Sequence, residues 1–258
     1  MEIQLHDGTG WRSLAVVMRT PDDDDCVDED LALGFLCSEG IISGLAAVES
    51  VAACTVAPSA QAEGNVMRVK LAANVVVDWA RMVRHTFSSS SCGVCGKASI
   101  ESACAVAPRL SSDLVVDVDV GVVLGLVGRL RDLQPVFQQT GGLHGAMLAT
   151  TAGEVVVVRE DVGRHNAVDK VIGHLLRHAL CPDDLLLVVS GRVGFELVQK
   201  ALAARIAVIA GVGAPTSLAV ALGSSGGVTV VGFVKAGSPA VSGGSCNVYS
   251  HAQRLRAG

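Results

Sequence analysis

The sequence predicts a mixed α/β protein (α+β overall), in which a smaller strand-rich N-terminal domain precedes an α/β C-terminal domain. Valine-rich runs such as residues 155–158 and 185–190 suit strands that are buried on both faces of a parallel sheet. Strand and helix patterns alternate around and after these runs, and that order favours parallel pairing through right-handed crossovers. Half of the 258 residues are hydrophobic but only 3% are aromatic, so aliphatic side chains must fill the core.

The N-terminal part contains strand patterns around one helix. Residues 2–20 indicate a hairpin that turns at Asp7 and Gly8. Residues 28–42 have apolar side chains at helical spacing, begin with acids that suit the helix dipole, and reach a stop signal at Gly40. Further expectations are strands within 48–57 and 65–72, a short helix near 99–106 and a linker at 107–113. We therefore divide the chain into domains 1–112 and 113–258.

The C-terminal part is more regular. Residues 120–133 indicate a helix, and residues 143–161 indicate two strands around the turn at Ala152 and Gly153. The remaining elements alternate: helix 163–180, strand 185–190, helix 195–204, strand 206–211, helix 216–223 and strand 228–234. This order predicts a parallel sheet whose strand ends and helix starts converge at one edge.

Glycine-rich turns follow three of these strands. The first contains Gly163 and Arg164, the second Gly191 and Arg192, and the third Gly213. Free backbone N–H groups at such turns favour anions, phosphate above all, and arginine adds charge-assisted hydrogen bonds. Ordinary strand-to-helix turns also need glycine, but three together favour a phosphorylated ligand. His144, which lies among glycines in residues 140–146, is either structural or close to that ligand.

Charge and hydropathy bear on the class of partner. The formal net charge is −5 and no basic patch with interleaved aromatics is present, so we expect no nucleic-acid partner. No apolar run approaches about 18 residues, so we expect no membrane span. The N-terminus does not have the pattern of a signal peptide, and we expect a cytoplasmic protein.

Cys92 and Cys95 lie in the segment SSSSCGVCGK, directly before a helical pattern. The pair is a metal clip, a redox disulfide or a carrier of a group on sulfur. Structural zinc needs a second cysteine or histidine pair at ligand spacing, and none lies nearby. The following helix start and Lys97 favour a thiolate, and a mobile Ser/Gly loop suits a thiol that must visit a donor and an acceptor.

Several stretches together resemble one family, the FdhD/NarQ family of formate dehydrogenase accessory sulfurtransferases. They run in the family's order over nearly the whole chain, and the combination of the cysteine loop with EDVGRHNAVDK is specific. The stretches are MRTP, DEDLALGFLCSEGII, SSSSCGVCGKASIE, TGGLHGA, VREDVGRHNAVDKVIG, SGRVGFELVQKA, APTSLAVAL and NVYSHAQRL.

The resemblance implies a bacterial homodimer that receives sulfur from a cysteine desulfurase as a persulfide. It passes the sulfur to the molybdenum cofactor, Mo-bis(molybdopterin guanine dinucleotide), before insertion into formate dehydrogenase. The persulfide cysteine maps to Cys92, with Cys95 as its partner. The family's cofactor-binding stretch maps to Phe233, Val234, Lys235, Ala236, Gly237 and Ser238, and the guanine nucleotide ends of the cofactor are expected on the glycine-rich turns. The C-terminal domain is expected to share the cytidine deaminase-like fold, with no catalytic metal.

Two features define the alternatives. A zinc deaminase needs H-x-E at one helix start and P-C-x-x-C at the next, and the corresponding stretches GRHNAVDK and SGRVGFELVQK lack both. The chain also has SPAVSGGS where the family passes almost directly from the last strand to NVYS. Because the zinc motifs are missing, deaminase chemistry is not expected even if the scaffold is shared, and the insertion bears on which residues contact the cofactor. The rival hypotheses are a zinc-dependent deaminase-like hydrolase and a non-catalytic cofactor-binding chaperone with inert cysteines.

Overall fold

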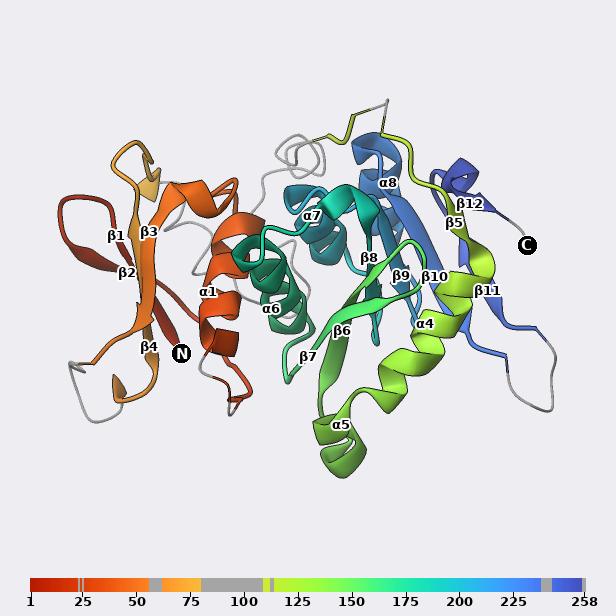
Figure 1. Ribbon diagram of the computed structural model, residues 1–258, viewed down its shortest axis with the longest axis horizontal. Helices are drawn as coiled ribbons and strands as arrows, with labels where there is room; N and C mark the ends of the chain where they lie inside the picture. Colours follow the sequence, from red (N-terminus) through yellow and green to blue (C-terminus); the bar gives the residue numbers. More distant parts are fainter. Residues whose placement is uncertain are drawn as a thin grey trace.

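The N-terminal part folds around a sheet of four strands in the order β2-β1-β4-β3 (Figure 1). The computed structural model describes residues 1–22, 24, 26–55, 62–79, 109–111, 114–237 and 243–256. β1 pairs antiparallel with β2 and parallel with β4, and β3 pairs antiparallel with β4. The strands are β1 (Glu2–His6), β2 (Trp11–Val16), β3 (Val48–Ala53) and β4 (Val66–Leu71).

The predicted hairpin and helix of this part are confirmed. Gly8, in the turn between β1 and β2, has a φ of 94°, a left-handed conformation that suits glycine. The helix is α1 (Cys26–Ser38), and Gly40 follows it with a φ of 72° and donates its N–H to the carbonyl oxygen of Cys37 at 2.9 Å. A short 3₁₀ turn, η1 (Leu45–Ala47), then leads into β3. The predicted helix near 99–106 lies outside the described residues.

The large sheet has six strands in the order β11-β10-β9-β8-β6-β7. β8, β9 and β10 are parallel, as predicted, while β6 is antiparallel to both β7 and β8. β7 therefore points the same way as β8, β9 and β10. The strands are β6 (His144–Thr150), β7 (Val155–Asp161), β8 (Leu185–Val189), β9 (Val208–Gly211), β10 (Thr229–Lys235) and β11 (Ser245–Val248).

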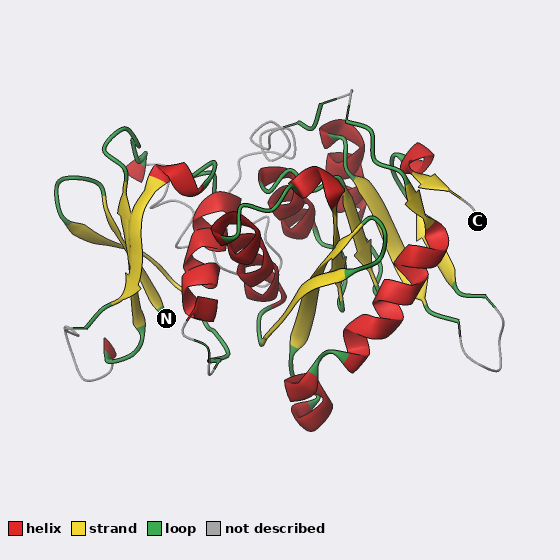
Figure 2. Cartoon of the chain, in the orientation of Figure 1, coloured by secondary structure: helices red, strands yellow, loops and turns green. Residues whose placement is uncertain are grey.

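Helices cover both faces of this sheet (Figure 2). α4 packs on one face, where Leu126 and Leu130 share a buried apolar cluster with Met147 and Val188. α6, α7 and α8 pack on the other face. The helices are α4 (Val120–Asp132), α5 (Pro135–Thr140), α6 (Arg164–Arg177), α7 (Phe195–Ala203) and α8 (Ser217–Gly226), with short turns η3 (Pro182–Asp184) and η4 (Ala252–Arg254).

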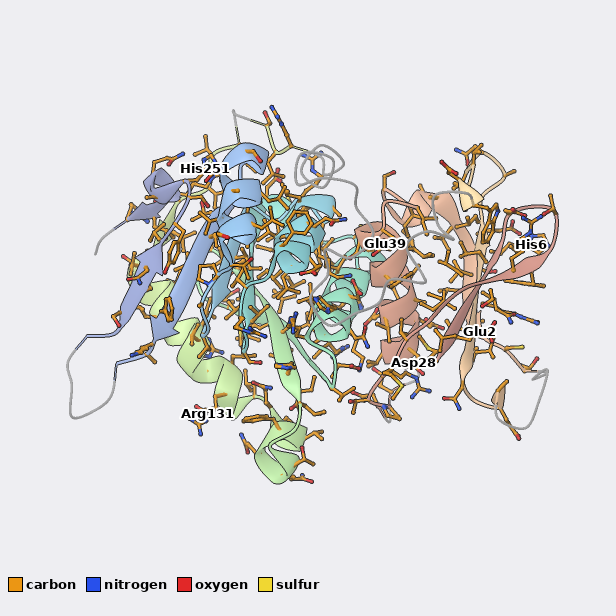
Figure 3. The ribbon with its side chains drawn as sticks, turned by 180° about the vertical axis from the view of Figure 1, so that it is seen from behind. Glu2, His6, Asp28, Glu39, Arg131 and His251 are labelled. Carbon is orange, nitrogen blue, oxygen red and sulfur yellow. The ribbon has the colours of Figure 1, made fainter. Side chains whose placement is uncertain are left out.

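The chain's two halves share one apolar core. Ile3 and Leu33 of the N-terminal part and Val171 and Leu187 of the large-sheet part belong to the same buried cluster. Figure 3 shows α1 from behind, with Asp28 and Glu39 labelled near its two ends. α1 packs against α6, which separates it from the large sheet. The predicted domain boundary after residue 112 lies outside the described residues and stays a prediction.

Two features of the strands differ from the prediction. The strand predicted from residue 206 begins at Val208, because Ile206 instead closes the end of α7 by donating its N–H to the carbonyl oxygen of Ala201. A further pair was not predicted: β5 (Val118–Asp119) and β12 (Leu255–Arg256) form a two-stranded parallel sheet that brings the C-terminal segment beside the start of α4. Strands this short carry no periodic signal in the sequence.

Candidate functional site

Four strands of the large sheet end at one edge, near the start of β6 and beside α5 in Figure 1. We call this the carboxyl edge: it contains the turns 162–163, 190–194 and 212–216, the end of β10 and the start of β6. Ligands of open α/β sheets bind beyond such strand ends, where helix amino termini converge. The predicted convergence of the three glycine-rich turns at one edge is therefore confirmed, and this edge is the candidate ligand site.

Backbone hydrogen bonds join the turns after β8 and β9 and Phe233 of β10 into a continuous row. Gly213 donates its N–H to the carbonyl oxygen of Gly191 at 3.0 Å, and Phe233 donates its N–H to the carbonyl oxygen of Gly213 at 3.1 Å. Val193 and Pro215 form an isolated parallel bridge between the same two turns. The row thus has a fixed backbone although Gly191 and Gly213 lie beyond the ends of β8 and β9.

Two glycines in the row are required by close packing. A Cβ atom at Gly213 would lie 2.9 Å from the backbone N and Cα atoms of Arg192, and one at Gly232 would lie 2.5 Å from Cδ of Pro215. Neither contact leaves room for a methyl group, because the atoms that it would meet belong to the backbone of Arg192 or to the rigid ring of Pro215. Gly213, which was predicted for ligand approach, and Gly232 therefore let neighbouring segments pack directly on one another.

Phe233 has an unusual backbone conformation compared with its neighbours in this row. Its φ is 53°, a left-handed backbone that costs a non-glycine residue roughly 1–2 kcal/mol. The residue is 44% exposed, whereas Val234 beside it is buried against α4. Lys235, Ala236 and Gly237 follow and are all exposed. A strained and exposed aromatic residue at a strand end is typical of ligand-binding positions.

Positive charge and an imidazole accompany the row. Arg164 begins α6, and Arg192 is exposed in the turn after β8. The ring of His144, at the start of β6, lies against Gly191, since a Cβ there would be 3.4 Å from His144 Nδ1. Burial lowers the pKa of His144, and the charges of Arg164 and His165 lower it further. His144 is therefore a neutral imidazole at neutral pH.

His165 and Glu196 face each other across the starts of α6 and α7. His165 Nε2 lies 3.9 Å from Glu196 Oε2, and the side chains are 31% and 17% exposed. Burial acts to raise the pKa of Glu196, but interactions with His165, its own backbone N–H and Arg164 hold that pKa below its usual value. The sequence reasoning missed Glu196, and the only signal was an acid in the first turn of a helix after a strand.

The N-terminal part contributes a segment to the carboxyl edge. Thr20 donates its N–H to Asp161 Oδ2 at 2.9 Å, and its hydroxyl accepts the N–H of Val162 at 3.0 Å. Lys170 Nζ binds the carbonyl oxygen of Thr20 and Asp161 Oδ2, at 2.9 and 2.8 Å. Asn166 donates to the carbonyl oxygen of Met18. The MRTP motif thus fastens the N-terminal part to the turn after β7.

Three of the predicted site residues, Cys92, Cys95 and Ser238, lie outside the described residues. Phe233, Val234, Lys235, Ala236 and Gly237 lie together at the end of β10. In the part of the chain that the structure describes, no group of three His, Cys, Asp or Glu side chains is placed to share a metal ion. The same described segments include no helix that is both long enough and apolar enough to cross a membrane.

The fold and the carboxyl edge define a mixed α/β protein whose candidate site combines glycine turns, arginine side chains and an exposed aromatic residue. Comparison with known proteins then identifies the family to which the chain belongs. It belongs to the FdhD/NarQ family, whose sequence model matches residues 2–256.

Relatives agree with this placement. The chain is 43% identical over 261 residues to a sulfur carrier protein FdhD of Streptomyces coelicolor. This alignment covers 99% of this chain and 86% of the relative. A sulfur carrier protein FdhD of Saccharolobus solfataricus is 40% identical over 242 residues, with 93% and 83% covered. A crystal structure of a candidate formate dehydrogenase accessory protein from Desulfotalea psychrophila has the same fold, with a TM-score of 0.67 at 22% identity, over 99% of this chain and 87% of that one.

Proposed function

We propose that this chain is a sulfur carrier in the maturation of formate dehydrogenase. It takes sulfur as a persulfide from a cysteine desulfurase and passes it to the molybdenum cofactor before the cofactor enters the enzyme. Family membership over residues 2–256 and the names of the relatives support a sulfur-carrier role. The proposal places the protein in the cytoplasm as a homodimer.

The cysteine pair carries the sulfur in this proposal. The Cys92 thiolate attacks the outer sulfur of the donor's persulfide, the donor's S–S bond breaks, and the donor cysteine leaves as a thiolate. Cys92 then holds a persulfide. Release of its outer sulfur as sulfide requires two electrons, which Cys95 supplies by forming a disulfide with Cys92.

The binding part of the proposal is carried by one observation, the hydrogen-bonded row of Gly191, Gly213 and Phe233 at the carboxyl edge. An exposed aromatic ring can stack on a nucleobase. Backbone N–H groups of glycine turns and arginine side chains suit phosphate groups. These features fit the guanine nucleotide part of the cofactor, and the proposed contact segment is Phe233, Val234, Lys235, Ala236, Gly237 and Ser238.

We also propose that the large sheet and its helices form a cytidine deaminase-like scaffold without deaminase chemistry. The starts of α6 and α7 carry Arg164, His165 and Glu196, but neither the H-x-E nor the P-C-x-x-C pattern of such zinc sites. A bound cofactor would supply the molybdenum centre that accepts the sulfur. The chain's own residues bind its nucleotide and bring the persulfide to it.

The carrier role is tested by mass spectrometry of the full chain after incubation with a cysteine desulfurase and cysteine. The Cys92 peptide should gain the mass of one sulfur atom, and Cys92→Ala should abolish the gain and formate dehydrogenase maturation. Cys181→Ala, which changes an exposed cysteine, is the matched control. Full maturation by the Cys92 variant would refute the proposal and favour a cofactor-binding chaperone with inert cysteines.

A further inference from the structure

A cavity of about 390 Å³ opens between the chain's two halves, at the end of the large sheet that lies opposite the carboxyl edge. Residues near the ends of α1, α6 and α7 line it, together with residues 43–45 and part of η3. α6 leads through η3 into the start of β8, and α7 leads into the start of β9, which places the cavity at the amino ends of these strands. Its volume is within the range of roughly 300–1,000 Å³ that small-molecule sites occupy.

The inner wall of this cavity is apolar. Leu175 and Ala204 are buried there, and Leu176 and the more exposed Leu45 continue the aliphatic surface toward solvent. Cys37 also lines the cavity, and burial raises the pKa of its thiol, so that it contributes a neutral and weakly polar group. Covering such a wall with an aliphatic or thioether side chain is favoured by the hydrophobic effect.

Two side chains of opposite charge also line the cavity. Asp183 belongs to η3, and Arg205 directly follows the C-cap residue of α7. Asp183 is partly exposed, although its Oδ1 atom is buried without a hydrogen-bond partner, and Arg205 is exposed. Among the described residues neither charge takes part in an ion pair, and the two do not pair with each other. The cavity thus holds one acid and one base that a ligand can pair with.

The backbone around the cavity adds partial negative charge and strain. α6 and α7 both end here, and the last carbonyl groups of a helix carry partial negative charge. Ala179 follows α6 with a φ of 49°, and Arg205 follows α7 with a φ of 62°. Glycine is the usual residue in this left-handed position after a helix. Strained residues cluster at ligand sites, and an arginine in place of glycine puts a guanidinium group at the rim.

This lining restricts the charge of the ligand. A simple anion would meet the Asp183 carboxylate and the helix carbonyl groups, and a simple cation would meet Arg205. An uncharged apolar molecule would leave both side chains unpaired. A zwitterion with an apolar side chain satisfies every part of the lining. Its ammonium group donates to the carboxylate and to backbone carbonyl oxygens, and its carboxylate accepts from the guanidinium group.

We propose that this cavity binds a free α-amino acid with an aliphatic or thioether side chain. The bound amino acid contacts both halves of the chain, because Leu45 belongs to the N-terminal part while Asp183 and Arg205 belong to the large-sheet part. It therefore stabilises the folded chain by mass action. The site is separate from the proposed function, since it lies at the opposite end of the sheet from the carboxyl edge.

Calorimetry on the full chain tests the proposal with L-leucine, L-methionine and glycine. The better of the first two should bind at least tenfold more tightly than glycine, which has no side chain to cover the apolar wall. Leucinamide lacks the carboxylate and N-acetyl-leucine lacks the ammonium group. Each should bind about tenfold to a hundredfold more weakly than leucine, the effect of losing one charged hydrogen bond. Leucine should also raise the midpoint of thermal unfolding.

Two variants assign the contacts. Arg205→Gln should weaken leucine binding by about tenfold or more and leave the affinity for leucinamide unchanged, because that analogue has no carboxylate for the arginine to bind. Asp183→Asn should weaken leucine binding similarly and leave the affinity for N-acetyl-leucine unchanged. Arg131→Gln, at an exposed position of α4 on the other face of the sheet, is the matched control and should change neither. Circular dichroism of each variant checks that it is folded.

Three outcomes would overturn the proposal. The first is that neither leucine nor methionine gives heat or a thermal shift with the unaltered chain at millimolar concentration. The second is that both variants bind leucine as the unaltered chain does. The third is that N-acetyl-leucinamide, which has neither charge, binds as tightly as leucine. That result would instead assign the cavity to an apolar side chain within a partner's polypeptide.

Discussion

Gly34 of α1 and Gly173 of α6 occupy reciprocal positions where the two helices touch. A Cβ atom at Gly34 would lie 1.8 Å from the carbonyl oxygen of Asp169 in α6, and a Cβ at Gly173 would lie 1.8 Å from the carbonyl oxygen of Asp30 in α1. The helices therefore meet backbone to backbone, closer than side chains would allow. This contact joins the N-terminal part to the helical layer of the large sheet.

A methyl group at either position should separate the helices. Gly34→Ala and Gly173→Ala are each expected to lower the free energy of unfolding by about 3 kcal/mol or more, because the backbone cannot move aside without opening the shared core. Denaturant unfolding followed by circular dichroism measures the change. Gly125→Ala in α4 is the control, since nothing lies within 4 Å of its Cβ and alanine favours a helix. Equal stability of all three variants would contradict this account of the contact.

A buried ion pair joins three helices behind this contact. Lys200 of α7 binds both carboxylate oxygens of Asp169 in α6, at 2.7 and 2.8 Å, and Ser38 of α1 donates to Asp169 Oδ1 at 2.7 Å. Lys200→Met leaves a buried carboxylate without its cation and should destabilise the protein by about 3–5 kcal/mol. The double variant Asp169→Asn with Lys200→Met should recover part of this loss. Denaturant unfolding measures the three variants. If the double variant is less stable than the unaltered chain by the sum of the Asp169→Asn and Lys200→Met effects, the two residues act independently and the prediction is wrong.

Phe233 should separate ligand binding from stability. Phe233→Gly removes the left-handed strain and should leave the free energy of unfolding unchanged or raise it by about 1 kcal/mol. The same change removes the exposed ring and should weaken GDP binding by about tenfold or more, the typical contribution of one stacked base. Calorimetry and thermal unfolding of one preparation measure both quantities. Phe233→Tyr, which keeps the ring, should retain the affinity, and GDP binding by Phe233→Gly at full strength would remove Phe233 from the site.

Cys37 should be unreactive at ordinary pH. Burial raises the pKa of the Cys37 thiol to about 11, and the charge of Asp169 adds to the effect although Lys200 opposes it. Since the thiolate is the reactive form, only about one thiol in a thousand is ionised at pH 8, and the fraction grows as the pH rises toward 11. Alkylation by iodoacetamide, followed by peptide mass spectrometry, should label exposed Cys181 at pH 8 and leave Cys37 unmodified. Labelling of both at similar rates would contradict the burial of this thiol.

Most elements of the large sheet were predictable because their signals are local. Valine-rich strands, amphipathic helices and glycine turns are properties of about five to fifteen neighbouring residues. The glycines 163, 191 and 213 were predicted to meet at one edge, since successive parallel strands end on the same side. The position of β6 between β7 and β8 could not be predicted, because a hairpin can pair with either neighbour.

The candidate site was predictable only in part. The segment that begins at Phe233 was found through resemblance, but its left-handed backbone follows from how β10 meets the turn at Gly213. Glu196 was missed because an acid in a first helical turn has an ordinary explanation, the helix dipole. Its approach to His165 depends on the spacing of α6 and α7, to which residues far apart in the sequence contribute.

The sequence by itself determined the elements, the glycine turns at the strand ends, the pair Cys92 and Cys95 and the family. The tertiary structure alone decided that α1 packs on α6 through Gly34 and Gly173, and that Glu196 faces His165. Periodicity and turn chemistry act between residues a few positions apart and can be read along the chain. Helix contacts and side-chain pairing depend on close packing between segments that are far apart along the chain, which no local pattern records.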